Sequence, residues 1–274
     1  SRARKSPAAC ERAWPSMNNT IAKPEVIIDR VTPVKRLRVL TINTHKGFTA
    51  LNRRFILPEL RSAVQATGSD LVFLQEVLGN HALHAKRFHD WPSVPQYEFL
   101  ADSMWPQFAY GRNAVYPAGD HGNALLSRFP ILEYHNLDVT VSGTEQRGLL
   151  HVNLLVDGIE MHAIVVHFGL IHASRERQVQ RLGAYIQSTV PAGAPLIVAG
   201  DFNDWGAQLL RPMSAMDLHT FEGIRLATYP SRLPLLHLDR VFVRGLRLVS
   251  AKVPHGRVWS RMSDHLPLIA ELEL

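Results

Sequence analysis

Acidic and amide side chains follow a short apolar segment near the middle of the last third of the chain. Residues 196–199 form an apolar run that predicts a buried strand, and Gly200 ends it. Asp201, Asn203 and Asp204 come directly afterwards. A strand that carries a carboxylate and an amide to its carboxyl end is a common base for a rigid active site. Because Asp and Asn also favour turns, this segment alone leaves a turn and an active site equally open.

Other strand-like runs end in, or lead into, side chains of the same chemical kinds. These acids, amides and histidines are Asn43, Glu76, His167, Asp239, Asp264 and His265. Each has a plain structural explanation, such as a turn residue, a paired buried acid or a core histidine. Their repeated position at strand ends favours one shared site.

The oxygen donors in this group suit a hard divalent cation. Mg²⁺ and Mn²⁺ prefer one or two carboxylates together with water and substrate phosphate, and Asn43, Glu76 and Asp264 offer such oxygens. A zinc site of the usual kind is not indicated, because the chain has one cysteine, Cys10, and no HExxH sequence.

The remaining members have the chemical types that phosphoester hydrolysis requires. That reaction needs a base for water, donors for the phosphoryl oxygens and help for the leaving group. Residues of the right types for these tasks are His167, Asp201, Asn203 and His265.

The elements that would position these side chains are mainly strands. Alternating or apolar runs predict strands at 37–43, 71–74, 124–128, 131–141, 147–155, 159–167, 196–199, 238–243, 246–253 and 267–273. Apolar residues at helical spacing predict helices at 52–66 and 174–189. Two packed, mostly antiparallel sheets with helices outside are the economical α/β (α+β) arrangement for one core of this size.

Residues 77–121 are predicted to be loop-like. They hold eight of the chain's 22 aromatic residues, which favours either a structured insertion over a site or a satellite hydrophobic cluster under a long loop.

The composition describes an ordinary globular chain. Hydrophobic residues make up 46% of the 274 residues and charged residues 20%. No apolar run approaches the roughly 18 residues that a membrane span needs. The single cysteine permits no internal disulfide, so we expect a cytoplasmic protein.

The net charge of +6 comes from one end of the chain. The first 38 residues hold nine of the 30 Lys and Arg residues and three of the 24 acids, so the remainder has 21 of each. We therefore predict a basic, disordered tail over residues 1–36 and a domain over 37–274. The neutral body argues against strong nonspecific nucleic-acid binding, although charge can be segregated locally.

A set of short segments in order resembles the endonuclease/exonuclease/phosphatase (DNase I-like) superfamily. The segments are Thr41–Asn43, Leu74–Glu76, Gly122–Pro130, Gln146–Gly148, Val166–His167, Gly200–Asn203, Leu238–Phe242 and Ser263–His265. They span almost all of 37–274, and the chain is most similar to bacterial members with unassigned substrates. The resemblance implies a four-layer sandwich of two sheets flanked by helices, and metal-dependent hydrolysis of a phosphoester.

The resemblance also implies roles for particular residues. Glu76 would bind Mg²⁺ or Mn²⁺, with Asn43 and Asp264 close to it. The implied catalytic residues are His167, Asp201, Asn203, Asp239 and His265, with Asp239 orienting His265, Asn203 donating to a phosphoryl oxygen and His167 facing the phosphate from the other side. Either Asp201 or His265 would be the base. Asn123 and Arg147 would contact substrate or support the residues that do.

One position departs from the family pattern. Some nucleases of the family carry an acid two residues after the first Asn, where this chain has His45, followed by Lys46. This leaves one or two metal ions open, and it adds two possible phosphate-binding cations.

The sequence therefore predicts a monomeric, metal-dependent phosphodiesterase or phosphatase, with nuclease activity one possibility. A phospholipid or another small phosphodiester is the alternative substrate, since the aromatic residues of 77–121 permit apolar walls. A catalytically silent binding module of the same fold is the third reading, but no central residue is missing.

Overall fold

The computed structural model of this protein describes residues 36–49 and 54–274. The predicted tail lies outside these residues apart from Arg36, which already belongs to the first strand. Within the described residues, no helix is both long and apolar enough to cross a membrane.

Eleven strands and five α-helices are found in the described residues. The strands are β1 (Arg36–Asn43), β2 (Leu71–His81), β3 (Gln107–Tyr116), β4 (Gly119–Ser127), β5 (Ile131–Asp138), β6 (Gly148–Val156), β7 (Ile159–His167), β8 (Leu196–Asp201), β9 (Asp239–Arg244), β10 (Arg247–Lys252) and β11 (Leu268–Glu273). The α-helices are α1 (Leu57–Ala66), α2 (Ala82–Arg87), α3 (Gln96–Ala101), α4 (His172–Thr189) and α5 (Leu210–Ser214). Short 3₁₀ turns are η1 (His45–Gly47), η3 (Asp102–Met104) and η4 (Trp259–Arg261).

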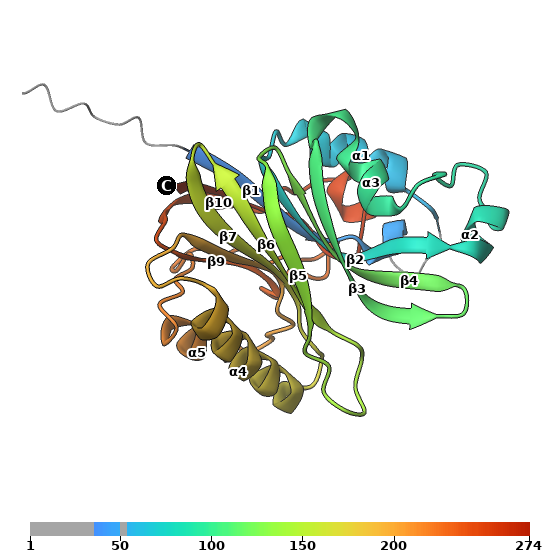
Figure 1. The fold of residues 1–274 in the computed structure, drawn as a ribbon. Coiled ribbons are helices and arrows are strands. Elements are labelled where there is room, and N and C mark those ends of the chain that lie inside the picture. The colour runs from blue at the N-terminus through green and yellow to red at the C-terminus, as the bar shows by residue number, and fades with distance from the viewer. Residues whose placement is uncertain (1–35, 50–53) are drawn as a thin grey trace, which may run out of the picture. The chain divides into compact units, whose positions relative to one another are not determined.

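The strands form two mixed sheets, as Figure 1 shows. One has the order β10-β11-β1-β2-β4-β3 and the other the order β5-β6-β7-β8-β9. The β1–β2 and β7–β8 pairs are parallel, and every other pair is antiparallel. The prediction of two mostly antiparallel sheets flanked by helices is confirmed.

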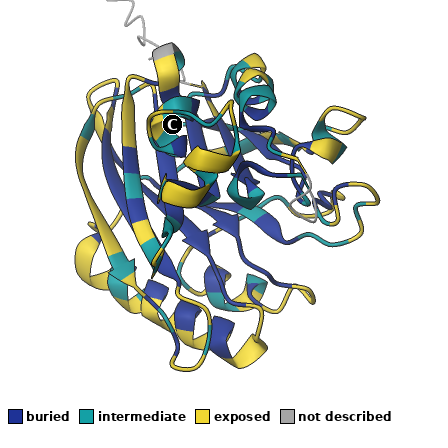
Figure 2. Ribbon diagram, turned by 90° about the vertical axis from the view of Figure 1, so that its right-hand side faces the viewer, coloured by how far each residue is buried: buried dark blue, intermediate teal, exposed yellow. Residues whose placement is uncertain are grey.

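Three hydrophobic clusters hold the layers together. The central cluster joins the facing sides of the two sheets, with Phe73 from β2 against side chains such as Val165 from β7. A second cluster packs α1 and α3 onto the outer face of the first sheet, and a third packs α4 onto the outer face of the second. Buried residues accordingly fill the strands, while the exposed residues lie on the helices and loops (Figure 2). Burial of this apolar surface is the main stabilising contribution to the fold.

The two longest helices follow from local sequence. In α4, Val179, Leu182 and Ile186 recur at helical spacing and are all buried. The helix α1 begins at Leu57 rather than at the predicted residue 52, because Pro58 has no N–H to donate and fits the first turn of a helix.

The prediction that residues 77–121 are loop-like is wrong. The strand β2 continues to His81, α2 and α3 follow, and β3 and β4 form a hairpin. Bulges interrupt the pairing after Leu74 and after Arg112, and β3 is an edge strand that is partly exposed. Both features remove the regular alternation that marks a strand in sequence.

Much of the aromatic content of this segment packs against itself. The rings of Phe55 and Trp91 stack with centroids 4.8 Å apart, and Phe88 lies 5.4 Å from Phe48. These contacts support the satellite-cluster interpretation.

Two buried histidines on the second sheet predict acid sensitivity. The Nε2 atom of His151 lies 2.9 Å from Nδ1 of His162, and its Nδ1 lies 3.0 Å from the Tyr185 hydroxyl. Burial, and then the neighbouring His162, lower the pKa of His151 to about 4, and burial also lowers the pKa of His162. Both rings are therefore neutral in the folded protein at neutral pH.

This neutrality stabilises the fold above the ordinary histidine pKa of 6.5 and is lost as the pH falls toward about 4. We expect His151 to contribute about 2 kcal/mol to the acid-induced loss of unfolding free energy between about pH 7 and pH 4.5. Urea unfolding at both pH values measures it. The loss should shrink in His151→Gln and persist in His135→Gln, which changes the exposed cross-strand partner of His151. Equal losses in all three proteins would contradict the assignment.

Candidate active site

Ends of neighbouring strands bring the central side chains together. Because β7 and β8 are parallel, His167 and Asp201 end their strands at the same edge and are register partners. Asp239 begins β9 opposite Asp201, and Asn43 ends β1 in the other sheet. The site therefore draws on both sheets.

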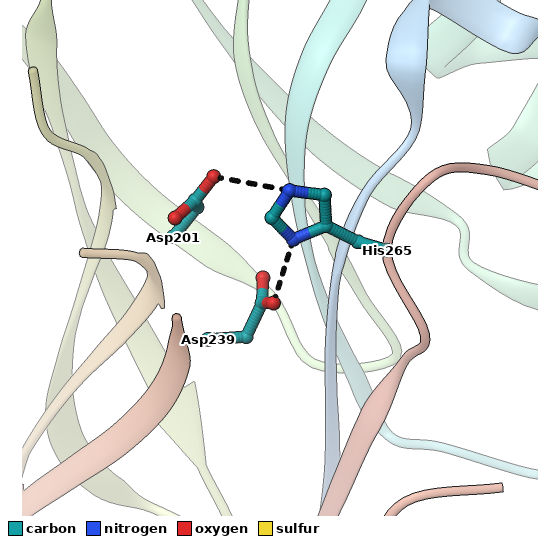
Figure 3. A group of neighbouring side chains, drawn as sticks. All are labelled: Asp201, Asp239 and His265. Atoms are coloured by element: carbon teal, nitrogen blue, oxygen red, sulfur yellow. Dashed lines mark hydrogen bonds and ion pairs between the residues drawn. The ribbon is translucent and has the colours of Figure 1, made fainter. Parts of the chain in front are cut away.

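His265 lies between two carboxylates, as Figure 3 shows. Its Nδ1 is 2.8 Å from Oδ2 of Asp239, and its Nε2 is 3.7 Å from Oδ2 of Asp201. The three side chains are almost fully buried, with exposed fractions of 6%, 0% and 2% for His265, Asp239 and Asp201. The Asp239 contact fixes the orientation of the ring and leaves Nε2 facing Asp201.

One oxygen of Asp201 is the meeting point of the group. Besides His265, its Oδ2 accepts a hydrogen bond from Nδ2 of Asn43 at 3.3 Å and lies 3.5 Å from Nε2 of His167. The other oxygen accepts the backbone N–H of Asn203 at 2.9 Å.

The buried charges shift one another's protonation. Burial raises the pKa of Asp201 to about 7, even though the nearby His265 lowers it. Burial alone would lower the pKa of His265, but Asp239 and Asp201 outweigh it and raise that pKa to about 10. Burial, followed by the charge of Arg147, lowers the pKa of His167 well below its usual range. The site thus holds a charged histidine and a neutral one on two sides of Asp201.

A bulge in β2 points Glu76 toward the site. Glu76 has a φ of 54°, and the pairing of β2 with β4 shifts between Leu74 and Val77. A non-glycine residue in this region is strained, and such strain is common at functional sites. The Oε1 atom of Glu76 accepts a hydrogen bond from Nδ2 of Asn43 at 3.3 Å.

His45 lies between the two predicted metal-binding carboxylates. Its Nδ1 is 3.4 Å from Oδ1 of Asp264 and 4.0 Å from Oε2 of Glu76. Lys46 is next in the same 3₁₀ turn, with a φ of 57°. The position where some nucleases of this type carry an acid is therefore filled by a ring that contacts both acids.

The segment Gly200–Asn203 has the tight geometry that its sequence indicates. Gly200 has a φ of 150°, and a Cβ there would lie 1.9 Å from the Val166 carbonyl oxygen, so only glycine fits. Asn203 donates one side-chain N–H to the Phe168 carbonyl at 2.9 Å. An amide nitrogen carries two hydrogens, so one remains for another acceptor.

Asn123 and Arg147 lie behind the central group. Asn123 is fully buried and donates to the Gly148 and Val165 carbonyls, which tie β4 to the opposite sheet. Arg147 donates to the Phe168 carbonyl at 3.3 Å and pairs with Glu145. These contacts favour a supporting role for both residues over direct contact with substrate.

Two supporting hydroxyls were not among the predicted site residues. Thr228 donates to Oδ2 of Asp239 at 2.5 Å, and Ser263 donates to the Asn43 carbonyl at 2.7 Å. Ser263 precedes Asp264 in one of the segments that resemble the family, so its position in sequence was a usable signal. Thr228 had none beyond its place in the segment before β9.

Two sets of side chains could hold a divalent ion. Asp201, Asp239 and His265 each offer one donor atom, and these atoms lie within 4.8 Å of one another. In this set, however, Nδ1 of His265 is already bonded to Asp239, and all three side chains are buried. A charged imidazole is not a metal ligand, since ligating histidine must be neutral.

The second set, Asn43, Glu76 and Asp264, presents only oxygen donors among those that a hard cation prefers. The Glu76 and Asp264 side chains are 22% and 30% exposed. Mg²⁺ keeps several of its waters when it binds, so partly exposed oxygens fit a hydrated ion better than the buried set does.

Comparisons with known proteins agree with this architecture. A model of the endonuclease/exonuclease/phosphatase family matches residues 40–265. Uncharacterized protein YbhP of Escherichia coli K12 is 48% identical over 247 residues, which cover 86% of this chain and 96% of that protein.

Solved structures share the fold at low identity. An endonuclease/exonuclease/phosphatase protein of Beutenbergia cavernae superposes with a TM-score of 0.69 at 21% identity, over 88% of this chain and 72% of that one. A mannosyl-6-phosphatase of Bacteroides thetaiotaomicron gives 0.67 at 18% identity, over 86% and 99%. The fold is DNase I-like, and the chain belongs to the endonuclease/exonuclease/phosphatase family.

Proposed function

We propose that this protein hydrolyses a phosphodiester with the help of Mg²⁺ or Mn²⁺. The observation that carries the proposal is the convergence of Asn43, His167 and His265 on one oxygen of Asp201. The convergence assembles an acid, an amide and two imidazoles from both sheets at one point, as acid–base catalysis on a phosphoester requires.

In this proposal Asp201 is the base that takes a proton from the attacking water. Both ring nitrogens of His265 face carboxylates, which favours the doubly protonated ring. His265 therefore serves as a donor that stabilises negative charge on the phosphoryl oxygens, and Asp239 keeps it in place. His167 faces the phosphate from the other side of Asp201, and Asn203 contributes its free N–H.

Glu76, Asn43 and Asp264 would hold the metal ion. Such an ion, when bound, neutralises charge on the phosphoryl oxygens and makes phosphorus more electrophilic. His45, between Glu76 and Asp264, then borders the same phosphate. Relatives with the fold include a protein titled as a mannosyl-6-phosphatase, so a monoester substrate is the second candidate.

The test is hydrolysis by the purified protein with Mg²⁺, Mn²⁺ or EDTA. The substrates are plasmid DNA, single-stranded DNA, RNA, bis-p-nitrophenyl phosphate, p-nitrophenyl phosphate and a phospholipid dispersion. We expect metal-dependent turnover of at least one diester and its loss in Asp201→Asn. Turnover confined to the monoester would favour a phosphatase. No turnover on any substrate, together with no metal binding by calorimetry, would support a silent fold.

A further inference from the structure

A large cavity rich in arginine lies beside the proposed metal ligands. It has a volume of about 880 Å³, and its charged lining consists of Arg54, Glu59, Arg232, Arg257 and Arg261. Four cations and one anion therefore face the same space.

Three of these cations are not neutralised. Arg54 pairs with Glu59, whose Oε1 lies 2.5 Å from its guanidinium. The side chains of Arg232, Arg257 and Arg261 make no ion pair or hydrogen bond with any of the residues that the structure describes. Like charges gathered around a concave surface create a positive potential that attracts anions.

The cavity is continuous in sequence with the catalytic residues. Arg261 precedes Asp264 by three positions, and Arg232 follows Ser231, whose backbone N–H donates to the Asp264 carbonyl at 2.7 Å. On the opposite wall, Thr49 follows the 3₁₀ turn that carries His45. The cavity therefore borders the side of the site where Glu76 and Asp264 would hold the metal.

We propose that this cavity binds a second, uncleaved phosphate group of the substrate, so that the substrate carries at least two phosphates. The inference rests on the proposed function, since the first phosphate is the one that is hydrolysed. Guanidinium groups match phosphate oxygens with paired hydrogen bonds, which makes arginine better suited than lysine to this task. Ile56, Val258 and Met262 line the same cavity and provide apolar contact for the uncharged part between the two phosphates.

The kinetic test uses two substrates that differ only in the second phosphate. These are the p-nitrophenyl ester of thymidine 5′-phosphate and the same ester with an added 3′-phosphate. We expect the ratio of their kcat/KM values to favour the second substrate, and to fall about tenfold in a double variant, Arg257→Gln with Arg261→Gln. The control is Arg211→Gln, an exposed arginine on α5 outside the cavity, which should leave the ratio unchanged.

A binding measurement separates this inference from the proposed function. Titration calorimetry with inorganic phosphate in EDTA should show an affinity about tenfold lower in the double variant than in the parent and in Arg211→Gln. That loss would support an anion site even if neither nucleotide were hydrolysed. Hydrolysis with an unchanged ratio would overturn the inference and leave the hydrolase intact. Equal phosphate affinity in all proteins would overturn it as well. Lost phosphate binding with an unchanged ratio would assign the cavity to free phosphate instead.

Discussion

The Asp201→Asn variant is expected to hydrolyse its phosphoester substrate about 1000-fold more slowly than the unmodified protein. The substitution keeps the shape of the side chain but removes the proposed base and the oxygen charge on which Asn43, His167 and His265 converge. Steady-state kinetics with saturating Mg²⁺ measures the effect on kcat.

The fold should survive this substitution. Burial raises the pKa of Asp201 to about 7, which means that the environment disfavours its charged form. We therefore expect the thermal midpoint of Asp201→Asn to equal or exceed that of the unmodified protein.

The matched control is Asp204→Asn. Asp204 is equally buried, but its two oxygens accept the backbone N–H groups of Gln208 and Leu209 and so support local structure. That variant should lose stability and keep its turnover per folded molecule. If Asp201→Asn retained near-normal kcat, Asp201 would be removed from the mechanism and His265 would be the remaining candidate for the base.

The Glu76→Gln variant is expected to bind Mn²⁺ about 100-fold more weakly, because it replaces a charged oxygen ligand with a neutral amide. Titration calorimetry without substrate measures the affinity directly, and the Mg²⁺ concentration for half-maximal hydrolysis should rise in parallel. The hydrogen bond from Asn43 has an oxygen acceptor in either side chain, so a large loss of stability is not expected.

Two further variants make this result specific. Glu133→Gln changes an exposed acid on β5 and should leave metal affinity unchanged. Asp239→Asn tests the buried alternative of Asp201, Asp239 and His265. If Mn²⁺ binding were lost in Asp239→Asn and retained in Glu76→Gln, the metal would belong to the buried set and the assignment to Glu76 would be wrong.

The parts of the fold that depend on local sequence were predictable. The apolar run before Asp201 and the helical spacing of Val179, Leu182 and Ile186 need no knowledge of the rest of the chain, because burial on one face imposes its own period. The edge strand β3 was missed for the complementary reason. Its partly exposed faces and the bulge after Arg112 leave no such period.

The sequence by itself determined the chemical types at the site, the family resemblance and the two-sheet architecture, because residue identity and hydrophobic pattern are properties of the chain. Only the tertiary structure decided which groups meet. It turned Glu76 inward through a bulge, placed His45 between two acids and set His265 between Asp201 and Asp239. It also gathered unpaired arginines from distant segments around one cavity. Contacts of this kind join residues far apart in the chain, so they depend on how the layers pack rather than on any local pattern.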